Sequence, residues 1–309
     1  MAPTPDSSEN YELLEARLKT LLPEEYQDSY QDVQPVSMGS ADLKFGGDGR
    51  VLWDEIWGAF CDLAMAGGPP HRGTLLEAGA KASIDLELGR YLQVVNELCR
   101  GVEMVTGLAA EPSSIAGWLR VDCPSTSMAG WLVRAINIEN VSAHVGGMVL
   151  YLPAGPHFRL EKQTKNVITS IAKTCHYWLG HMSVAQHSAI ADLFKTMEVE
   201  SPLIQPPFPP HDTRTPVFET LRDSIAESIH SQTGFQVTGL EYHGWLGINC
   251  LNLPAAVWML RVMVASNVLC RREGIFIYVP VNPSTDRNGN RITGLLLRAY
   301  RLARAHQVI

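Results

Sequence analysis

The chain has 309 residues, of which 46% are hydrophobic and 18% charged, a composition typical of a globular protein with a sizeable core. Its net charge of −7 argues against a dedicated nucleic-acid-binding protein, which normally carries a basic excess. No apolar run approaches the length of a membrane span, the first residues do not form a signal sequence, and the six cysteines are scattered. We therefore expect a soluble, cytoplasmic protein whose cysteines are reduced.

Residues 1–50 form an acidic leader that contains one predicted helix, over residues 11–22. Its apolar side chains recur at helical spacing: Leu13, Leu14, Leu18, Leu21 and Leu22. Residues 23–35, which are acidic and end at a proline, are predicted to be a solvated loop. We expect the leader to be either a flexible arm or a segment that docks on a neighbouring subunit.

Apolar residues recur every three or four positions over residues 51–66, which predicts a second amphipathic helix, packed on the segment that follows. Gly67 and Gly68 are expected to end this helix, because glycine adopts the left-handed cap conformation and the next two residues are prolines. Residues 67–73 are then expected to form a tight loop.

The most informative feature of the chain is an internal repeat. Residues 91–153 align without a gap with residues 218–280, at a spacing of 127, and share 14 identities. The identical pairs are Thr106/Thr233, Gly107/Gly234, Gly117/Gly244, Trp118/Trp245, Leu119/Leu246, Cys123/Cys250, Ala129/Ala256, Trp131/Trp258, Arg134/Arg261, Asn140/Asn267, Val141/Val268, Gly147/Gly274, Tyr151/Tyr278 and Pro153/Pro280. Two copies of one unit commonly pack about a pseudo-twofold axis, so a ligand cleft is expected between or beside them.

Each copy has the pattern helix, strand, helix, strand, helix, which predicts an α/β fold, or alternatively an α+β fold. The predicted elements cover residues 88–105, 117–123, 127–140, 147–152 and 165–182 in the first copy, and residues 217–232, 244–250, 254–268, 274–279 and 291–306 in the second. We place the first copy with its preceding helix at residues 51–200 and the second at 217–309. Residues 201–216, with six prolines, are predicted to be an extended crossover.

Polar residues that differ between the copies, or that are charged within apolar helices, are candidates for binding. Ser125, Thr126 and Ser127 enter a helix and either cap it or bind an anion with the backbone amides. Arg134 and Arg261 lie at matched positions in apolar helices, so each needs a partner. They either form reciprocal ion pairs across the pseudo-twofold axis or bind an anion.

Histidine–arginine pairs in two loops are candidates for acid–base chemistry. His71 lies beside Arg72 in the Gly/Pro loop, and His157 lies near Arg159 after a predicted strand. A loop that follows the carboxyl end of a strand commonly lines the ligand crevice of an α/β fold. Histidine moves a proton near neutral pH while arginine orients an anionic substrate, although ordinary turn chemistry explains the same residues.

A third set of candidates lies in and after the predicted helix over residues 165–182. It comprises Cys175, His176, His181 and His187. Imidazole and thiolate are good ligands for zinc and related divalent ions, but the spacing matches no standard metal motif. On one unbroken helix, the five-residue spacing of His176 and His181 would also direct their side chains apart. Gly180, with Ser183 as a new N-cap, is expected to break that helix and relax the objection. His176 is also a candidate acid or base.

The leading hypothesis is an enzyme that acts on an anionic small molecule at a site lined by histidine and arginine, mainly on the first copy. The alternative is a non-catalytic homo-oligomeric binding or scaffold protein. A third hypothesis is metal-dependent chemistry at the cysteine and the three histidines. We expect no membrane partner. Nucleic acid is an unlikely partner, because the arginines of the last predicted helix are outweighed by the negative net charge of the chain.

Overall fold

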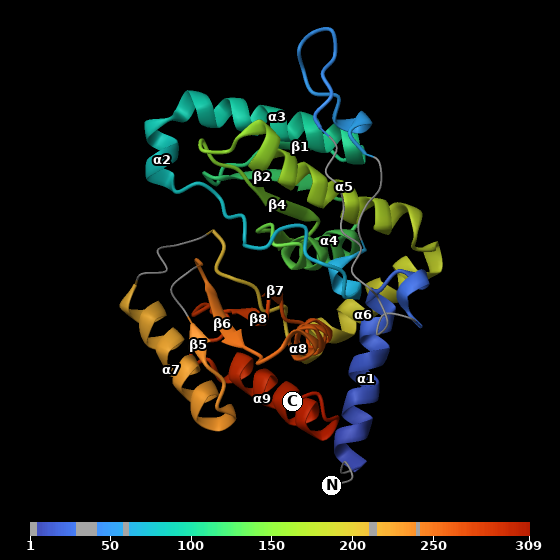
Figure 1. Cartoon of the computed structure of the whole chain (residues 1–309), viewed down its shortest axis with the longest axis vertical. Coiled ribbons are helices and arrows are strands. Elements are labelled where there is room, and N and C mark those ends of the chain that lie inside the picture. The colour runs from blue at the N-terminus through green and yellow to red at the C-terminus, as the bar shows by residue number, and fades with distance from the viewer. Residues whose placement is uncertain (1–4, 29–41, 58–61, 210–214, 239–241) are drawn as a thin grey trace. The chain divides into compact units, whose positions relative to one another are not determined.

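A computed structural model describes residues 5–28, 42–57, 62–209, 215–238 and 242–309 (Figure 1). The chain divides into two compact units. One comprises Pro23–His187 and is called the 23–187 unit; the other comprises Met1–Leu22 together with Ser188–Ile309 and is called the two-segment unit. The predicted leader is therefore shared between the two units, because its helix and the residues that follow belong to different ones.

The 23–187 unit packs helices on a four-stranded sheet. In chain order its elements are the short helices η1 (Glu24–Tyr26), η2 (Trp53–Glu55) and η3 (Ala64–Ala66), then α2 (Lys81–Leu86), α3 (Leu88–Thr106), β1 (Ala110–Pro112), β2 (Trp118–Asp122), α4 (Thr126–Ile138), β3 (His144–Gly146), β4 (Val149–Pro153), the π-helix η4 (Leu160–Thr164) and α5 (Lys165–Gly180). The sheet order is β1-β2-β4-β3, and every pairing is antiparallel. The helices α3, α4 and α5 lie close to the predicted ranges 88–105, 127–140 and 165–182, whereas η1, α2 and η4 were not predicted.

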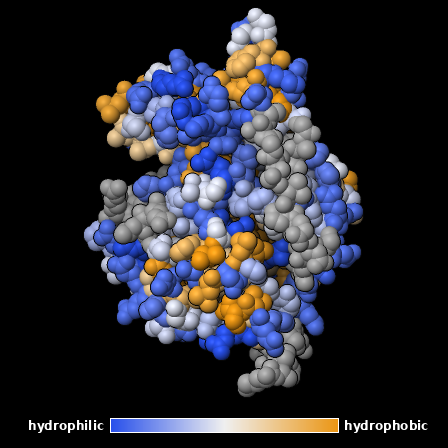
Figure 2. All heavy atoms as spheres, in the orientation of Figure 1, coloured by the Kyte–Doolittle hydropathy of each residue, from blue (hydrophilic) through white to orange (hydrophobic). Residues whose placement is uncertain are grey.

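The sheet of this unit buries one face. Leu119 pairs with Leu152 and Val121 with Leu150, and all four side chains are fully buried. This alternation follows from the two-residue period of a strand. Figure 2 shows hydrophilic side chains over much of α3 and an apolar patch at the end of α2, where Leu86 is 86% exposed.

The two-segment unit has the same order of elements around its own sheet. Its elements are α1 (Pro5–Leu21), α6 (Val184–Glu200, whose first four residues belong to the other unit), α7 (Pro216–Thr233), β5 (Val237–Thr238), β6 (Trp245–Asn249), α8 (Leu253–Ala265), β7 (Arg271–Glu273), β8 (Phe276–Pro280) and α9 (Asn290–Ala305). The sheet order is β5-β6-β8-β7, again antiparallel. Trp245 pairs with Pro280 here, as Trp118 pairs with Pro153 in the other sheet.

The helix of the leader, α1, packs on helices of its own chain. The predicted leucine stripe is buried except for Leu13, which is 48% exposed. Tyr11 stacks on Trp258 of α8 with ring centroids 5.6 Å apart, and Arg17 forms a 2.6 Å ion pair with Glu200 of α6. The expectation of a flexible arm or a segment docked on another subunit is therefore wrong for this helix. Residues 29–41 of the leader lie outside the described part of the chain.

An extended segment precedes the repeated elements in each unit. Leu76 forms a parallel bridge with Val141, and Ile204 forms one with Val268. Asn140, which precedes Val141, has a positive φ of 61°, and Asn267, which precedes Val268, has a positive φ of 63°. The two side chains donate hydrogen bonds of 2.8 and 2.7 Å to the carbonyls of Arg72 and Ser201. The proline-rich residues 201–209 thus belong to a paired segment, whereas residues 210–214 lie outside the described chain.

The helix predicted over residues 51–66 is wrong where the structure describes it. Trp53–Glu55 and Ala64–Ala66 form two separate short 3-10 helices, and residues 58–61 lie outside the described part. The apolar periodicity arises because Trp53, Ile56 and Leu63 are all buried from irregular backbone. Buried charged side chains bind this backbone directly, as described below, and so replace the hydrogen bonds of a helix. Gly67 is left-handed, with φ of 107°, as predicted.

Antiparallel pairing throughout both sheets fits the α+β alternative. The antiparallel pairing also removes one argument for the ligand site that was predicted at the loops after the strands. Neighbouring antiparallel strands end at opposite edges, so no single edge collects the loops after the strands, and the crevice rule for parallel sheets does not apply to Ser125–Ser127 or Arg159. Within the described residues, no helix is long and apolar enough to cross a membrane.

Candidate functional site

A groove with a cavity volume of about 220 Å³ lies on the 23–187 unit, between the chain before η2, the helix α3 and the π-helix η4. We call it the Arg50–Arg90 groove. Its lining residues are Gly49, Arg50, Val51, Arg90, Gln93, Val94, Glu97, Leu160 and Thr164. Two arginines, an amide and a hydroxyl therefore face one small space.

A tight turn presents Arg50 to the groove. Gly46 N–H donates to the Arg50 carbonyl (2.8 Å), and Arg50 N–H donates to Asp48 Oδ1 (3.0 Å). Gly49 has a φ of 75°, a conformation that glycine adopts at little cost. The Arg50 side chain is 57% exposed and lies 3.8 Å from Glu97, so its guanidinium is only loosely paired.

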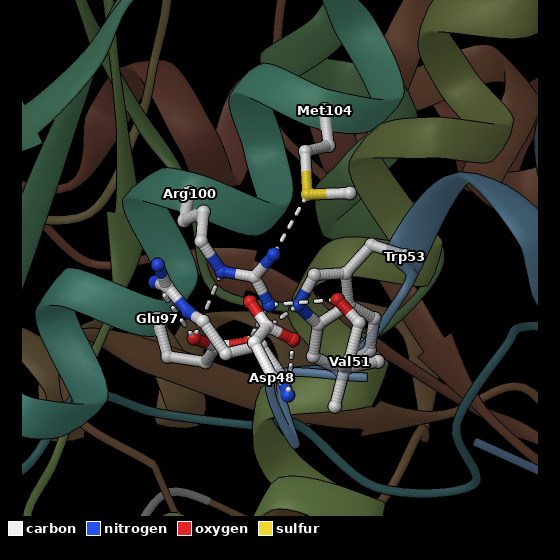
Figure 3. A network of polar contacts seen from close by, with 7 residues as sticks. Asp48, Val51, Trp53, Glu97, Arg100 and Met104 are labelled. Atoms are coloured by element: carbon white, nitrogen blue, oxygen red, sulfur yellow. Dashed lines mark hydrogen bonds and ion pairs between the residues drawn. The ribbon is translucent and has the colours of Figure 1, made fainter. Parts of the chain in front are cut away.

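A network at the base of the groove fixes Glu97 (Figure 3). Trp53 Nε1–H donates to Glu97 Oε1 (2.7 Å), and Arg100 donates to both carboxylate oxygens, with Nε 3.1 Å from Oε2. Arg100 also donates to the carbonyl of Val51 (2.8 Å) and to Sδ of Met104 (2.9 Å). The single carboxylate of the groove is therefore already compensated by Arg100, which leaves the positive charge of Arg50 and Arg90.

Arg90, in the first turn of α3, connects the groove to the start of η4. Its Nη2 donates to the Phe158 carbonyl (3.0 Å), and its Nη1 lies 3.5 Å from Gln93 Oε1. The backbone N–H of Arg159 is capped by Gln163 Oε1 (3.1 Å), so the chain enters η4 in a fixed direction. Arg90 thus has one guanidinium edge anchored on the protein.

His157 and Arg159 flank Phe158, the residue that Arg90 binds. Both side chains are exposed, and the His157 ring packs edge-on against Phe158 at 4.9 Å. Neither is among the residues that line the groove. Their predicted roles in proton transfer and anion contact therefore stay predictions.

His71 and Arg72 lie at a different place, beside a buried ion pair. Lys173 of α5 and Glu139 after α4 are fully buried and 2.8 Å apart. Glu139 also accepts from the backbone N–H groups of Ala64 (3.0 Å) and His71 (2.7 Å), and Lys173 donates to the Asp62 carbonyl (3.0 Å). The pair therefore clamps the loop before α2 onto two helices.

The imidazole of His71 is held by Asn166, with Nε2 and Oδ1 3.0 Å apart. Burial lowers the pKa of His71, and the carboxylate of Glu139 opposes that shift. Arg72 donates from Nε to the carbonyl of Thr74 (3.3 Å). The His71–Arg72 pair thus forms part of a braced loop, and its chemical role stays a prediction.

The hydroxyl-rich loop caps α4. Ser125 Oγ accepts from Met128 N–H (3.1 Å) and lies 3.0 Å from Ser127 Oγ, while Thr126 is exposed. Asn252 does the same at the matched position, accepting from Ala255 N–H (2.9 Å). Retention of the cap with a different side chain favours the capping interpretation. Arg134 is buried and donates from Nη1 to the Gly130 carbonyl (2.5 Å).

The four predicted metal ligands divide into two groups. Cys175 is buried, and burial raises the pKa of its thiol. His187 stacks on Trp178 at 4.2 Å, with Nε2 2.8 Å from the Trp178 carbonyl. His176 and His181 instead face each other, with Nε2 atoms 3.0 Å apart. Among the described residues, no three His, Cys, Asp or Glu side chains converge as a metal site.

Sequence reasoning missed the residues of the Arg50–Arg90 groove. A signal was present: Gly46-Gly-Asp-Gly49 is a turn sequence that places Arg50 at its end, and Glu97 and Arg100 have the three-residue spacing of a helix pair. The sequence does not show that this turn lies next to α3. Comparison with known protein families, curated proteins and solved structures finds no match to the chain.

Proposed function

We propose that the chain binds an anionic small molecule in the Arg50–Arg90 groove, with a carboxylate or phosphate held between the two guanidinium groups. The observation that carries this proposal is that two arginines distant in sequence line one groove together with Gln93 and Thr164. Arginine presents a planar set of donors that matches two acceptor oxygens, and it stays charged at any physiological pH.

The charge distribution supports an anionic rather than a cationic ligand. The carboxylate of Glu97 is engaged by Arg100 and Trp53, so it does not repel an incoming anion at full strength. The volume of about 220 Å³ suits a small molecule or one end of a larger one. We therefore expect binding of compact acids and phosphates rather than of extended polymers.

The groove is specific to one copy of the repeat. The positions that match Glu97 and Arg100 are Ser224 and Glu227, so the second copy lacks this ion pair. We infer that the two units are copies of one ancestral unit and that one of them specialised. The matched sheet orders and strand registers support this inference.

We propose binding as the primary role, because Glu97, the carboxylate that lines the groove, is engaged by Arg100 and Trp53, and the other described lining residues include neither histidine nor cysteine. Catalysis would require an acid, base or nucleophile at the ligand. His157, next to Phe158 and therefore near the anchored edge of Arg90, is the residue we would assign to proton transfer in an enzyme. A scaffold role would instead use exposed apolar surface such as Leu86, through which copies of the chain would associate.

The proposal is tested by isothermal titration of the whole chain with inorganic phosphate and with citrate, using glycerol as an uncharged control. We expect Arg50→Gln and Arg90→Gln each to weaken anion binding by about 10- to 150-fold, the equivalent of one charge-assisted hydrogen bond. Lys81→Gln is the matched control, because Lys81 is an exposed cation away from the groove with its own partner, Asp85. Equal binding by the wild type and both groove variants, or no anion binding at all, would refute the proposal.

A further inference from the structure

The C-terminal end of α5 brings two histidines together outside the Arg50–Arg90 groove. His176 lies four residues before Gly180, the last residue of α5, and His181 is the C-cap of this helix, with φ of −119° and ψ of 0°. On an unbroken helix a five-residue spacing would direct the two side chains about 140° apart. Because the helix ends at Gly180, the His181 ring turns back, and the ring centroids are 4.8 Å apart.

A carboxylate orients this pair from the other side. Glu25 Oε2 lies 2.8 Å from His181 Nδ1, the nitrogen that does not face His176. A carboxylate accepts only, so His181 Nδ1 carries a proton, and its Nε2 is a lone-pair donor in the neutral ring. The Nε2 of His181 is therefore presented as a ligand atom, directed at the Nε2 of His176.

The segment that carries Glu25 is fixed in place. Glu25 lies in η1, whose Tyr26 hydroxyl bonds Tyr177 Oη and Asp62 Oδ1 at 2.9 Å each. Ser183 donates to Glu24 Oε1 (2.7 Å) and accepts from Gln186 N–H (3.2 Å), which caps α6 as the sequence predicted. The three groups are thus held by η1, by the end of α5 and by the start of α6, before any ligand arrives.

We propose that His176 and His181 bind one divalent metal ion of the class that imidazole prefers, such as Zn²⁺, Ni²⁺ or Cu²⁺, through their Nε2 atoms. Two nitrogens at Zn–N distances of about 2.0–2.1 Å and a tetrahedral angle lie about 3.3 Å apart. The observed distance of 3.0 Å between the two Nε2 atoms is within a few tenths of an ångström of that separation. The ion takes the place of the proton on His176 Nε2, the neutral His176 ring then carries its proton on Nδ1, and water completes the coordination.

Glu25 is the positioning residue of this site. A carboxylate on the far nitrogen of a metal-bound histidine fixes the tautomer and raises the basicity of the ligand. Cys175 and His187 do not take part, because the thiol is buried and the His187 ring bonds the Trp178 carbonyl. The site is independent of the proposed anion groove, whose lining residues include none of these groups.

The test is titration of the metal-free chain with ZnCl₂ and NiCl₂ by calorimetry at pH 7.5, repeated at pH 5.5. We expect one ion per chain, loss of measurable binding in His176→Ala and His181→Ala, and weakening by about 10- to 100-fold in Glu25→Gln. Binding should fall at pH 5.5, since ligand histidines must be neutral. His157→Ala is the control for an exposed histidine elsewhere.

A second measurement separates metal binding from a structural role of the pair. The imidazole ¹⁵N resonances of His176 and His181 should shift at Nε2 when Zn²⁺ is added, whereas His157 should not respond. His181→Asn, which retains a polar cap, serves if the alanine variant fails to fold. Unchanged Zn²⁺ affinity in His176→Ala, or an equal loss in His187→Ala or His157→Ala, would overturn the proposal.

Discussion

The buried pair Glu139–Lys173 gives the sharpest prediction about stability. Both side chains are 0% exposed, and their charged atoms lie 2.8 Å apart. In Glu139→Gln the ammonium of Lys173 stays buried and keeps its hydrogen bond to the Asp62 carbonyl, but it loses the countercharge of the carboxylate. Removal of one member of a buried ion pair costs about 3–5 kcal/mol, because the other charge is left without compensation. For a unit of this size, that lowers the melting temperature by about 6–20 °C.

Urea denaturation of the whole chain, monitored by circular dichroism, measures this loss in the free energy of unfolding. Hydrogen exchange shows whether the loop before α2 is released. Lys81→Met is the matched control, because the Lys81–Asp85 pair has a similar distance of 2.6 Å but side chains that are 74% and 59% exposed. Such an exposed pair contributes about 0.5 kcal/mol or less. The double variant Glu139→Gln/Lys173→Met should cost less than the sum of the single variants. The reasoning is refuted if Glu139→Gln is no more costly than Lys81→Met.

Two further predictions concern single side chains. Burial lowers the pKa of His144 to about 3, below the ordinary value of 6.5, so the unfolded chain binds its proton first as the pH falls. The contribution of neutral His144 to the free energy of unfolding is complete above pH 6.5 and is lost as the pH falls toward 3. Between pH 7.5 and 5, the free energy of unfolding of the wild type should fall by about 2 kcal/mol more than that of His144→Gln, as measured by urea denaturation. Identical pH profiles would contradict this. Ser125→Ala should cost about 1 kcal/mol through loss of the α4 cap, whereas the neighbouring Thr126→Ala should change stability by less than about 0.5 kcal/mol, compared by thermal melting.

The repeated helices and the central strands were predictable because local patterns decide them, whereas α2 and α6 were not predicted. The helix predicted over residues 88–105 corresponds to α3, which ends only one residue later, at Thr106, before the left-handed Gly107. The strands β2 and β6 lie within the residues predicted for them. The edge strands β1, β3, β5 and β7 were missed. Each has only two or three residues, and its place is set by pairing with a central strand rather than by its own sequence.

The predicted helix over residues 51–66 failed because long-range interactions decide that region. Glu139 and Lys173 lie far along the chain, yet they bind the backbone at Asp62, Ala64 and His71. No local pattern contains those contacts. The candidate site was missed for the same reason, since Arg50 and Arg90 become neighbours only once the turn before η2 packs on α3.

The location of α1 has a consequence for synthesis on the ribosome. Its buried leucines and Tyr11 are covered by helices of the two-segment unit, among them α8, which begins at Leu253. At 5–20 residues per second, roughly 10–50 s pass between the appearance of α1 and that of α8. Meanwhile the intervening 23–187 unit has all of its own elements. The helix α1 is therefore made well before the helices that cover it, and its apolar face stays uncovered until they emerge.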